Sequence, residues 1–115
     1  MIGLSANLNY YLFNGNVNLR KGIFRLCESI RQEMSLDLSD ASNVYMFISQ
    51  NRKVVKILHY ERDFYVLYEK RPVMGKFKKP VFDEVSRCYR IQWSDMAYLM
   101  ESIVVDRMYA TPKDK

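Results

Sequence analysis

The sequence predicts an α+β fold: an antiparallel sheet, built on a central three-stranded meander, with two amphipathic helices packed on it. Three strand-length runs rich in β-branched and aromatic residues follow one another in the middle of the chain, at residues 44–49, 54–60 and 64–69. The connections between them, residues 50–53 and 61–63, are short enough to join only antiparallel neighbours. One amphipathic stretch precedes these runs and another follows them, so each predicted helix has a sheet to pack on.

Length and composition are those of one folded body. With 115 residues, 49% of them hydrophobic and 14% aromatic, the chain can bury a single core and lies far from disordered compositions. We expect residues 1–110 to form one α+β domain and residues 111–115 to be a disordered tail. Neither Cys27 nor Cys88 has the spacing of a metal or redox motif, no apolar run reaches membrane length, and the residues around Met1 to Tyr11 are not expected to be a secretory leader. We therefore expect reduced thiols in a cytoplasmic protein.

The first part of the chain predicts a strand, a turn and a helix. Residues 8–13 have strand composition, and Asn14-Gly15-Asn16 follow as a turn, because asparagine and glycine accept positive φ angles. Asn18 is expected to cap a helix over residues 19–34. The apolar side chains of this helix fall three and four positions apart on one face: Ile23, Leu26, Cys27, Ile30 and Met34. Residues 35–43 show no period and are expected to be a loop.

The part of the chain after the meander predicts a basic loop, another strand and a second helix. In residues 70–80, lysine and arginine alternate with phenylalanine, methionine and proline. Residues 87–93 are a strand candidate, and Ser94 is expected to cap the second helix. The apolar face of that helix consists of Met96, Leu99, Met100 and Ile103.

One lysine interrupts an apolar face of the meander. Alternation along the second run puts Lys56 on the same side as Val54 and Leu58, whereas His59 falls on the other side with Val55 and Ile57. We expect the Lys56 ammonium to reach the sheet edge along its aliphatic stem, or that face to be only half covered.

Side chains suited to catalysis are scarce. His59 is the only histidine, and at the end of a strand a packed imidazole is a simpler interpretation than a general base. Two acidic pairs, Asp37 with Asp40 and Asp83 with Glu84, are interpreted as solvated loop residues rather than a metal site. The four glycines are scattered and form no phosphate-binding loop. We therefore expect a protein without catalytic residues, metal or cofactor.

The positive charge of the chain is confined to one third of it. Residues 52–90 hold eleven Lys and Arg against five Asp and Glu, whereas the rest of the chain holds seven against eight. A local cationic surface attracts polyanions, and nucleic acid is the commonest polyanion in cells. The candidate phosphate-binding side chains are Arg52, Lys53, Lys56, Lys70, Arg71, Lys76, Lys78 and Lys79. The alternative interpretation is a solvated sheet face whose lysines discourage aggregation.

Phe77 allows two interpretations. It stands between lysines in a loop bounded by Gly75 and Pro80, where an aromatic ring can stack on a nucleobase. Such a ring can equally anchor its loop to the hydrophobic core. The sequence makes Phe77 a stacking candidate and leaves both interpretations open.

A further observation is the order in which short motifs follow one another. The chain runs through Asn18-Leu19-Arg20-Lys21-Gly22-Ile23 with Leu26 and Ile30, Tyr45-Met46-Phe47-Ile48 with Asn51-Arg52, Lys56-Ile57-Leu58-His59-Tyr60, Phe64, Leu67-Tyr68, Lys70-Arg71, Gly75, Phe77 and Pro80. In this order, over roughly residues 11–103, the chain resembles the insertion-sequence-66 accessory protein family, often called TnpB. Two positions depart from the family pattern: Asn18 stands where the family usually has Asp, and His59-Tyr60 stands where it has a tryptophan-containing pair.

The resemblance implies a protein of a bacterial mobile element that assists transposition beside a separate DDE-type transposase. It carries over no catalytic residues. The basic motif positions are Arg52, Lys56, Lys70 and Arg71, to which the first helix adds Arg20 and Lys21. The expected function is therefore non-catalytic: binding of the DNA backbone near an end of the element, while the transposase supplies the cleavage chemistry.

Two other functions are kept as alternatives. The first is a protein adaptor that recruits or stabilises the transposase, through an exposed strand edge or the aromatic surface around Tyr65, Tyr68 and Phe77, with little DNA contact. The second is a metal-dependent nuclease, which would need carboxylates grouped in space around a metal ion.

Overall fold

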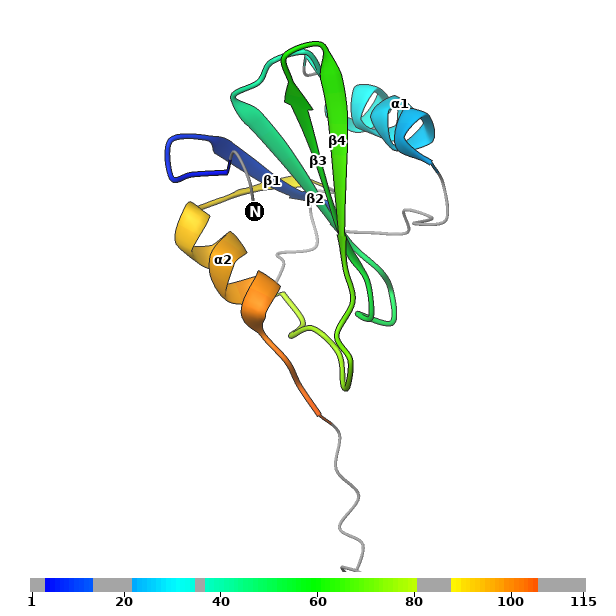
Figure 1. Cartoon of the computed structure of the whole chain (residues 1–115), viewed down its shortest axis with the longest axis vertical. Coiled ribbons are helices and arrows are strands. Elements are labelled where there is room, and N and C mark those ends of the chain that lie inside the picture. The colour runs from blue at the N-terminus through cyan, green and yellow to red at the C-terminus, as the bar shows by residue number, and fades with distance from the viewer. Residues whose placement is uncertain (1–3, 14–21, 35–36, 81–87, 106–115) are drawn as a thin grey trace, which may run out of the picture.

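The computed structural model describes residues 4–13, 22–34, 37–80 and 88–105 and has the α+β architecture that the sequence predicts (Figure 1). Five strands form one sheet in the spatial order β4-β3-β2-β1-β5. The strands are β1 (Asn9–Phe13), β2 (Asn43–Ile48), β3 (Val55–Glu61), β4 (Phe64–Lys70) and β5 (Cys88–Ile91), and the two helices are α1 (Ile23–Met34) and α2 (Trp93–Glu101).

The sheet is mixed, so the expectation of an antiparallel sheet is wrong at one pair of strands. β1 pairs with β2 in parallel, with Tyr11 opposite Tyr45, whereas the β1–β5, β2–β3 and β3–β4 pairs are antiparallel. The cause is the position of α1 between β1 and β2 in the chain. A helical crossover carries the chain back to the end of the sheet at which β1 began, so that β2 runs in the same direction as β1. Short connections constrain only the strands that they join directly, and none joins β1 to β2.

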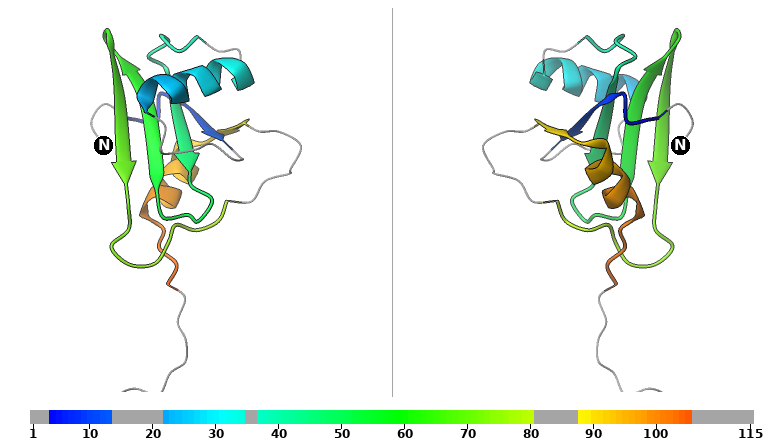
Figure 2. Two further views of the ribbon diagram at one scale, coloured as in Figure 1. Left: turned by 90° about the vertical axis from the view of Figure 1, so that its right-hand side faces the viewer. Right: turned by 90° about the vertical axis from the view of Figure 1, so that its left-hand side faces the viewer.

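The two helices cover opposite faces of the sheet (Figures 1 and 2). On one face the buried side chains of α1 pack with Phe13, Tyr45, Phe47 and Leu58. On the other face those of α2 pack with Tyr10, Leu12, Val44, Met46, Val55, Ile57 and Phe77. Because a helix covers each face of the sheet, the first five positions of β2 and the first five of β3 are buried, instead of every second position.

The helix boundaries follow the sequence in part. In α1, Leu26, Cys27 and Ile30 are buried as the spacing predicts, while Asn18, the predicted cap, and the turn 14–16 lie outside the described residues. In α2, Gln92 occupies the N-cap without a side-chain hydrogen bond, so the prediction that Ser94 caps this helix is wrong.

The end of α2 also differs from the prediction. The helix stops at Glu101, and Ser102 continues with extended backbone angles. Ile103 is therefore not part of the apolar helix face, and 60% of it is exposed. The predicted strand over residues 87–93 is shorter as well, because Trp93 already begins the helix. The predicted tail, 111–115, lies outside the described residues.

Phe77 provides a test of this packing. The side chain is 2% exposed and belongs to the core beneath α2, whereas Phe24 on α1 is 77% exposed. Replacing a buried phenylalanine by alanine removes its transfer free energy and leaves a cavity. We expect Phe77→Ala to lower the free energy of unfolding by about 3–5 kcal/mol, and the matched change Phe24→Ala to alter it by less than about 0.5 kcal/mol. Urea unfolding followed by circular dichroism measures both, and equal losses would contradict the core described above.

Candidate nucleic-acid interface

Three segments that are far apart in the sequence meet at one end of the sheet, the lower end in Figure 1. They are the β2–β3 connection (residues 49–54), the loop after β4 (residues 71–80) and the residues after α2 (102–105). The amide of Phe77 donates to the carbonyl of Arg52 at 2.8 Å. Lys76 and Val104 exchange two backbone hydrogen bonds, of 3.0 and 2.7 Å. These three bonds join the segments, and we call this region the basic end.

The β2–β3 connection is held by its own polar side chains. The hydroxyl oxygen of Ser49 accepts from the amides of Lys53 and Val54, at 3.1 and 3.0 Å, and the side-chain oxygen of Asn51 accepts from the Lys53 amide at 3.0 Å. Arg52 has a φ of 60°, a left-handed conformation that a tight connection of this kind requires. The backbone that carries Arg52 and Lys53 is therefore fixed before any ligand arrives.

Charge is segregated between the two ends of the sheet. The basic end together with the two residues that border it, Lys70 and Glu101, contains seven Lys and Arg and one carboxylate, that of Glu101. At the opposite end, residues 37–43 and 61–64 contain four Asp and Glu and one Arg. Because β2, β3 and β4 run between these ends, a six-residue strand separates them by roughly 20 Å at about 3.3 Å per residue.

An open pocket of about 540 Å³ lies between the three segments of the basic end. Its charged lining consists of Arg52, Lys53 and Lys76, and no carboxylate of the described residues lines it. The amides of Gln50 and Asn51 and the apolar side chains of Met74, Val104 and Val105 complete it. Three of the cations predicted from sequence thus converge on one hollow.

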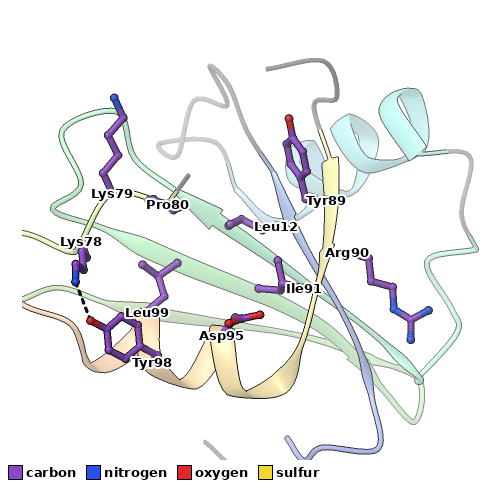
Figure 3. A pocket seen from close by; sticks show the side chains of 10 residues that line it. All are labelled: Leu12, Lys78, Lys79, Pro80, Tyr89, Arg90, Ile91, Asp95, Tyr98 and Leu99. Carbon is purple, nitrogen blue, oxygen red and sulfur yellow. Dashed lines mark hydrogen bonds between the residues drawn. The ribbon is translucent and has the colours of Figure 1, made fainter. Parts of the chain in front are cut away.

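A second pocket, of about 370 Å³, lies beside β5 and α2 (Figure 3). Its apolar lining includes Leu12, Ile91 and Leu99. The ammonium of Lys78 donates to the hydroxyl of Tyr98 at 2.8 Å and lies 5.3 Å from the centre of that ring. Figure 3 shows the Lys79 side chain pointing away from this pair. Lys78 is thus held against α2, whereas Lys79 extends to solvent.

Three other predicted cations are bound to carboxylates. Lys56 lies 3.5 Å from Glu69, Arg71 donates to the same carboxylate at 2.6 Å, and Lys70 lies 3.0 Å from Glu101. The hydrogen bond from Arg71, with the nearby charges of Arg71 and Lys56, holds the pKa of Glu69 below its usual range. These cations bring less net charge to the surface than the sequence suggests.

The position of Lys56 excludes it from a phosphate-binding surface. It is 8% exposed and lies opposite Phe47 on the face of the sheet that α1 covers. Its ammonium reaches Glu69 on the neighbouring strand, as expected of a long side chain directed to a sheet edge.

The aromatic residues do not form the surfaces that the sequence suggested. Phe77 is buried in the core beneath α2, so its ring anchors the loop and has no face for a nucleobase. Tyr65 and Tyr68 pack against opposite faces of the sheet, because they are three positions apart on β4. The three side chains therefore share no common surface.

The remaining candidate residues from the sequence are His59 and the acidic pairs. His59 is 4% exposed; its Nε2 lies 2.8 Å from the carbonyl oxygen of Ala41, and its Nδ1 lies 3.8 Å from a carboxylate oxygen of Glu61. Within the described segments, no three His, Cys, Asp or Glu side chains gather as a metal ion would need. No helix among those residues has the length and apolarity to cross a membrane. Arg20, Lys21, Asp83 and Glu84 lie outside the described residues.

The sequence analysis missed a group of exposed apolar side chains at the basic end. Val73 and Met74 are 105% and 68% exposed, and Ile103 and Val105 are 60% and 41% exposed. The available signal was the run from Pro72 to Gly75, two apolar residues between two turn-forming ones and flanked by cations.

Comparison with known protein families identifies the one to which this chain is similar. A family model described as IS66 Orf2 like protein matches residues 8–110, a span that includes both helices, all five strands and the basic end. Neither a curated protein nor a solved structure matches the chain.

The Glu69 cluster predicts how that carboxylate titrates. A pKa that folding depresses contributes stability above the unfolded pKa, and this contribution is lost as the pH falls through the depressed value. We expect the NMR-detected midpoint of Glu69 to lie below that of an unperturbed glutamate and to rise in Arg71→Ala. Lys70→Ala is the control, because Lys70 pairs with Glu101. An unchanged midpoint in Arg71→Ala would show that Arg71 does not set the charge state of Glu69.

Proposed function

The chain belongs to the IS66 Orf2 like protein family, a family of insertion-sequence accessory proteins, and on that premise we propose that it assists transposition by binding duplex DNA with its basic end. The phosphate backbone is the part of DNA that this surface suits. The transposase of the same insertion sequence would be the protein that it assists and the source of the cleavage chemistry.

The observation that carries this proposal is the convergence of three cations on one pocket of the basic end, which no carboxylate of the described residues lines. Arg52 and Lys53 come from one connection, and Lys76 from another, yet they line one pocket. Among the described residues, Arg52, Lys53 and Lys79 take part in no ion pair. Cations in this state displace the counterions condensed on DNA, which is the main source of sequence-independent affinity.

The segregation of charge supports a defined orientation on DNA. The carboxylates of Asp37, Asp40, Glu61 and Asp63 lie at the end of the sheet opposite the basic end. A molecule with this asymmetry is steered so that its positive end meets the polyanion and its negative end faces away. Contacts of this kind position a protein on the duplex without reading the base sequence.

A protein adaptor is the second candidate, and the edge position of β4 favours it. β4 is the last strand of the sheet, is seven residues long, and carries Phe64 at its start with 71% exposure. Unpaired backbone groups on such an edge can accept a strand from a partner. Nuclease-resistant co-purification with the transposase, lost when the outward-facing amides of β4 are blocked by a proline substitution, would support this function.

Salt dependence tests the DNA-binding proposal. Four phosphate contacts would give a slope of about −3.6 for log affinity against log salt. Arg52→Asn with Lys53→Gln removes two cations of the basic end, and asparagine tolerates the positive φ at position 52. We expect this double variant to flatten the slope by about 1.8, as measured by fluorescence anisotropy of a labelled duplex at several salt concentrations.

The matched control is Arg25→Gln with Arg31→Gln, which removes the same charge from exposed positions of α1. We expect its slope to stay within about 0.5 of the unsubstituted protein, because these side chains do not lie at the basic end. Equal effects of the two double variants would mean that only net charge matters. Absence of binding at low salt would refute the proposed function.

A further inference from the structure

The basic end carries an apolar tip that projects into solvent. Val73 and Met74 form it, with relative exposures of 105% and 68%, in the loop that follows β4. Beside it lie Ile103 and Val105, whose methyl groups are the near neighbours of a Cβ built on Gly75. Exposed apolar side chains that occur singly are ordinary, whereas a contiguous group on a small protein marks an interaction surface.

The backbone around the apolar tip is fixed on both sides. Before it, Lys70 is still paired with Val55 in the sheet, and Pro72 restricts the φ angle of the loop. After it, Lys76 forms its two hydrogen bonds with Val104. The five-residue loop 71–75 is therefore fixed at both ends, and it holds Val73 and Met74 exposed to solvent.

Gly75 makes the return of this loop possible. Its φ is +80°, and a Cβ at this position would lie 2.5 Å from the carbonyl oxygen of Val104. Any other residue would push the loop off the 102–105 segment. Met74 lines the cationic pocket together with Arg52, Lys53 and Lys76, and Val73 precedes Met74 in the chain.

We propose that Val73 and Met74 insert between two stacked base pairs from the minor groove and kink the duplex to which the basic end is bound. This inference rests on the proposed function and deepens it by naming a second kind of contact. A braced apolar pair flanked by cations suits a base step flanked by phosphates: the cations hold the backbone on either side while the apolar groups enter the stack. The kink brings more of the DNA backbone into contact with the protein, and these added contacts offset the free energy lost by unstacking the base pairs.

Charge complementarity is the reason to name DNA as the occupant of this surface. Arg71 and Lys76 each lie two positions from the apolar tip in the chain, and Arg52 and Lys53 line the pocket with Met74. The carboxylates of Glu69 and Glu101 are already engaged by Arg71 and Lys70. An apolar protein partner would desolvate Arg52 and Lys53, which form no ion pair with a carboxylate of the described residues, and this is costly.

The experiment measures bending and binding on one sample. A duplex of about 30 base pairs, labelled with a donor and an acceptor at its two ends, is titrated with the full chain; end-to-end energy transfer reports bending, and anisotropy reports binding. We expect the unsubstituted protein to raise the energy transfer on binding. Val73→Ser with Met74→Ser should bind with the same salt slope and an affinity reduced by no more than about tenfold, and should abolish the rise.

A second substrate and a control variant sharpen this experiment. A duplex with one mismatched pair is already partly unstacked, so the unsubstituted protein should bind it about tenfold more tightly, and the Val73→Ser, Met74→Ser variant should lose this preference. Phe64→Ser removes an exposed apolar side chain at the end of the sheet opposite the basic end, and this variant should bend DNA as the unsubstituted protein does.

Each outcome separates the two proposals. Binding by the unsubstituted protein without a rise in energy transfer overturns the insertion of Val73 and Met74 and leaves DNA binding intact. A full rise in the Val73→Ser, Met74→Ser variant also overturns it. No binding by any variant overturns the proposed function, and insertion with it.

Discussion

The geometry of the basic end depends on three backbone hydrogen bonds between segments that are distant in the chain. One joins Phe77 to Arg52, and two join Lys76 to Val104. They hold the β2–β3 connection, the loop after β4 and the residues after α2 against one another, while Phe77 anchors the same loop in the core. Without this junction, like-charged loops would repel one another and separate; with it, their cations line one pocket.

The arrangement of one helix on each face of the sheet explains why these three segments meet where they do. The parallel β1–β2 pair places α1 on one face, and the return through β5 brings α2 along the other toward the basic end. The negative end of the α2 dipole and Glu101 then meet Lys70 there. Both helices thus bury the apolar faces of the sheet, and the charged side chains lie in the loops at the ends of the strands.

Local patterns predicted the α+β class, the order of strands and helices along the chain and most buried positions, because these follow from alternation and helical spacing in residues such as Val55, Ile57, Leu26 and Ile30. The pairing of β1 with β2 and the end of α2 were missed, since both are set by tertiary contacts. At the candidate site, the sequence identified Arg52, Lys53 and Lys76. Burial of Lys56 and Phe77, and the carboxylate partners of Lys70 and Arg71, depend on neighbours across the sheet that spacing does not reveal.

The central claim is that DNA meets this protein at one end of the sheet. Its most direct test is to map backbone amide chemical shifts by NMR while a short duplex is added at low salt. The account predicts that the perturbed amides cluster in residues 50–53, 73–79 and 103–105, with little change at residues 37–43 and 61–64. Perturbations concentrated along β4 or on the outer face of α1, with the basic end unchanged, would contradict it.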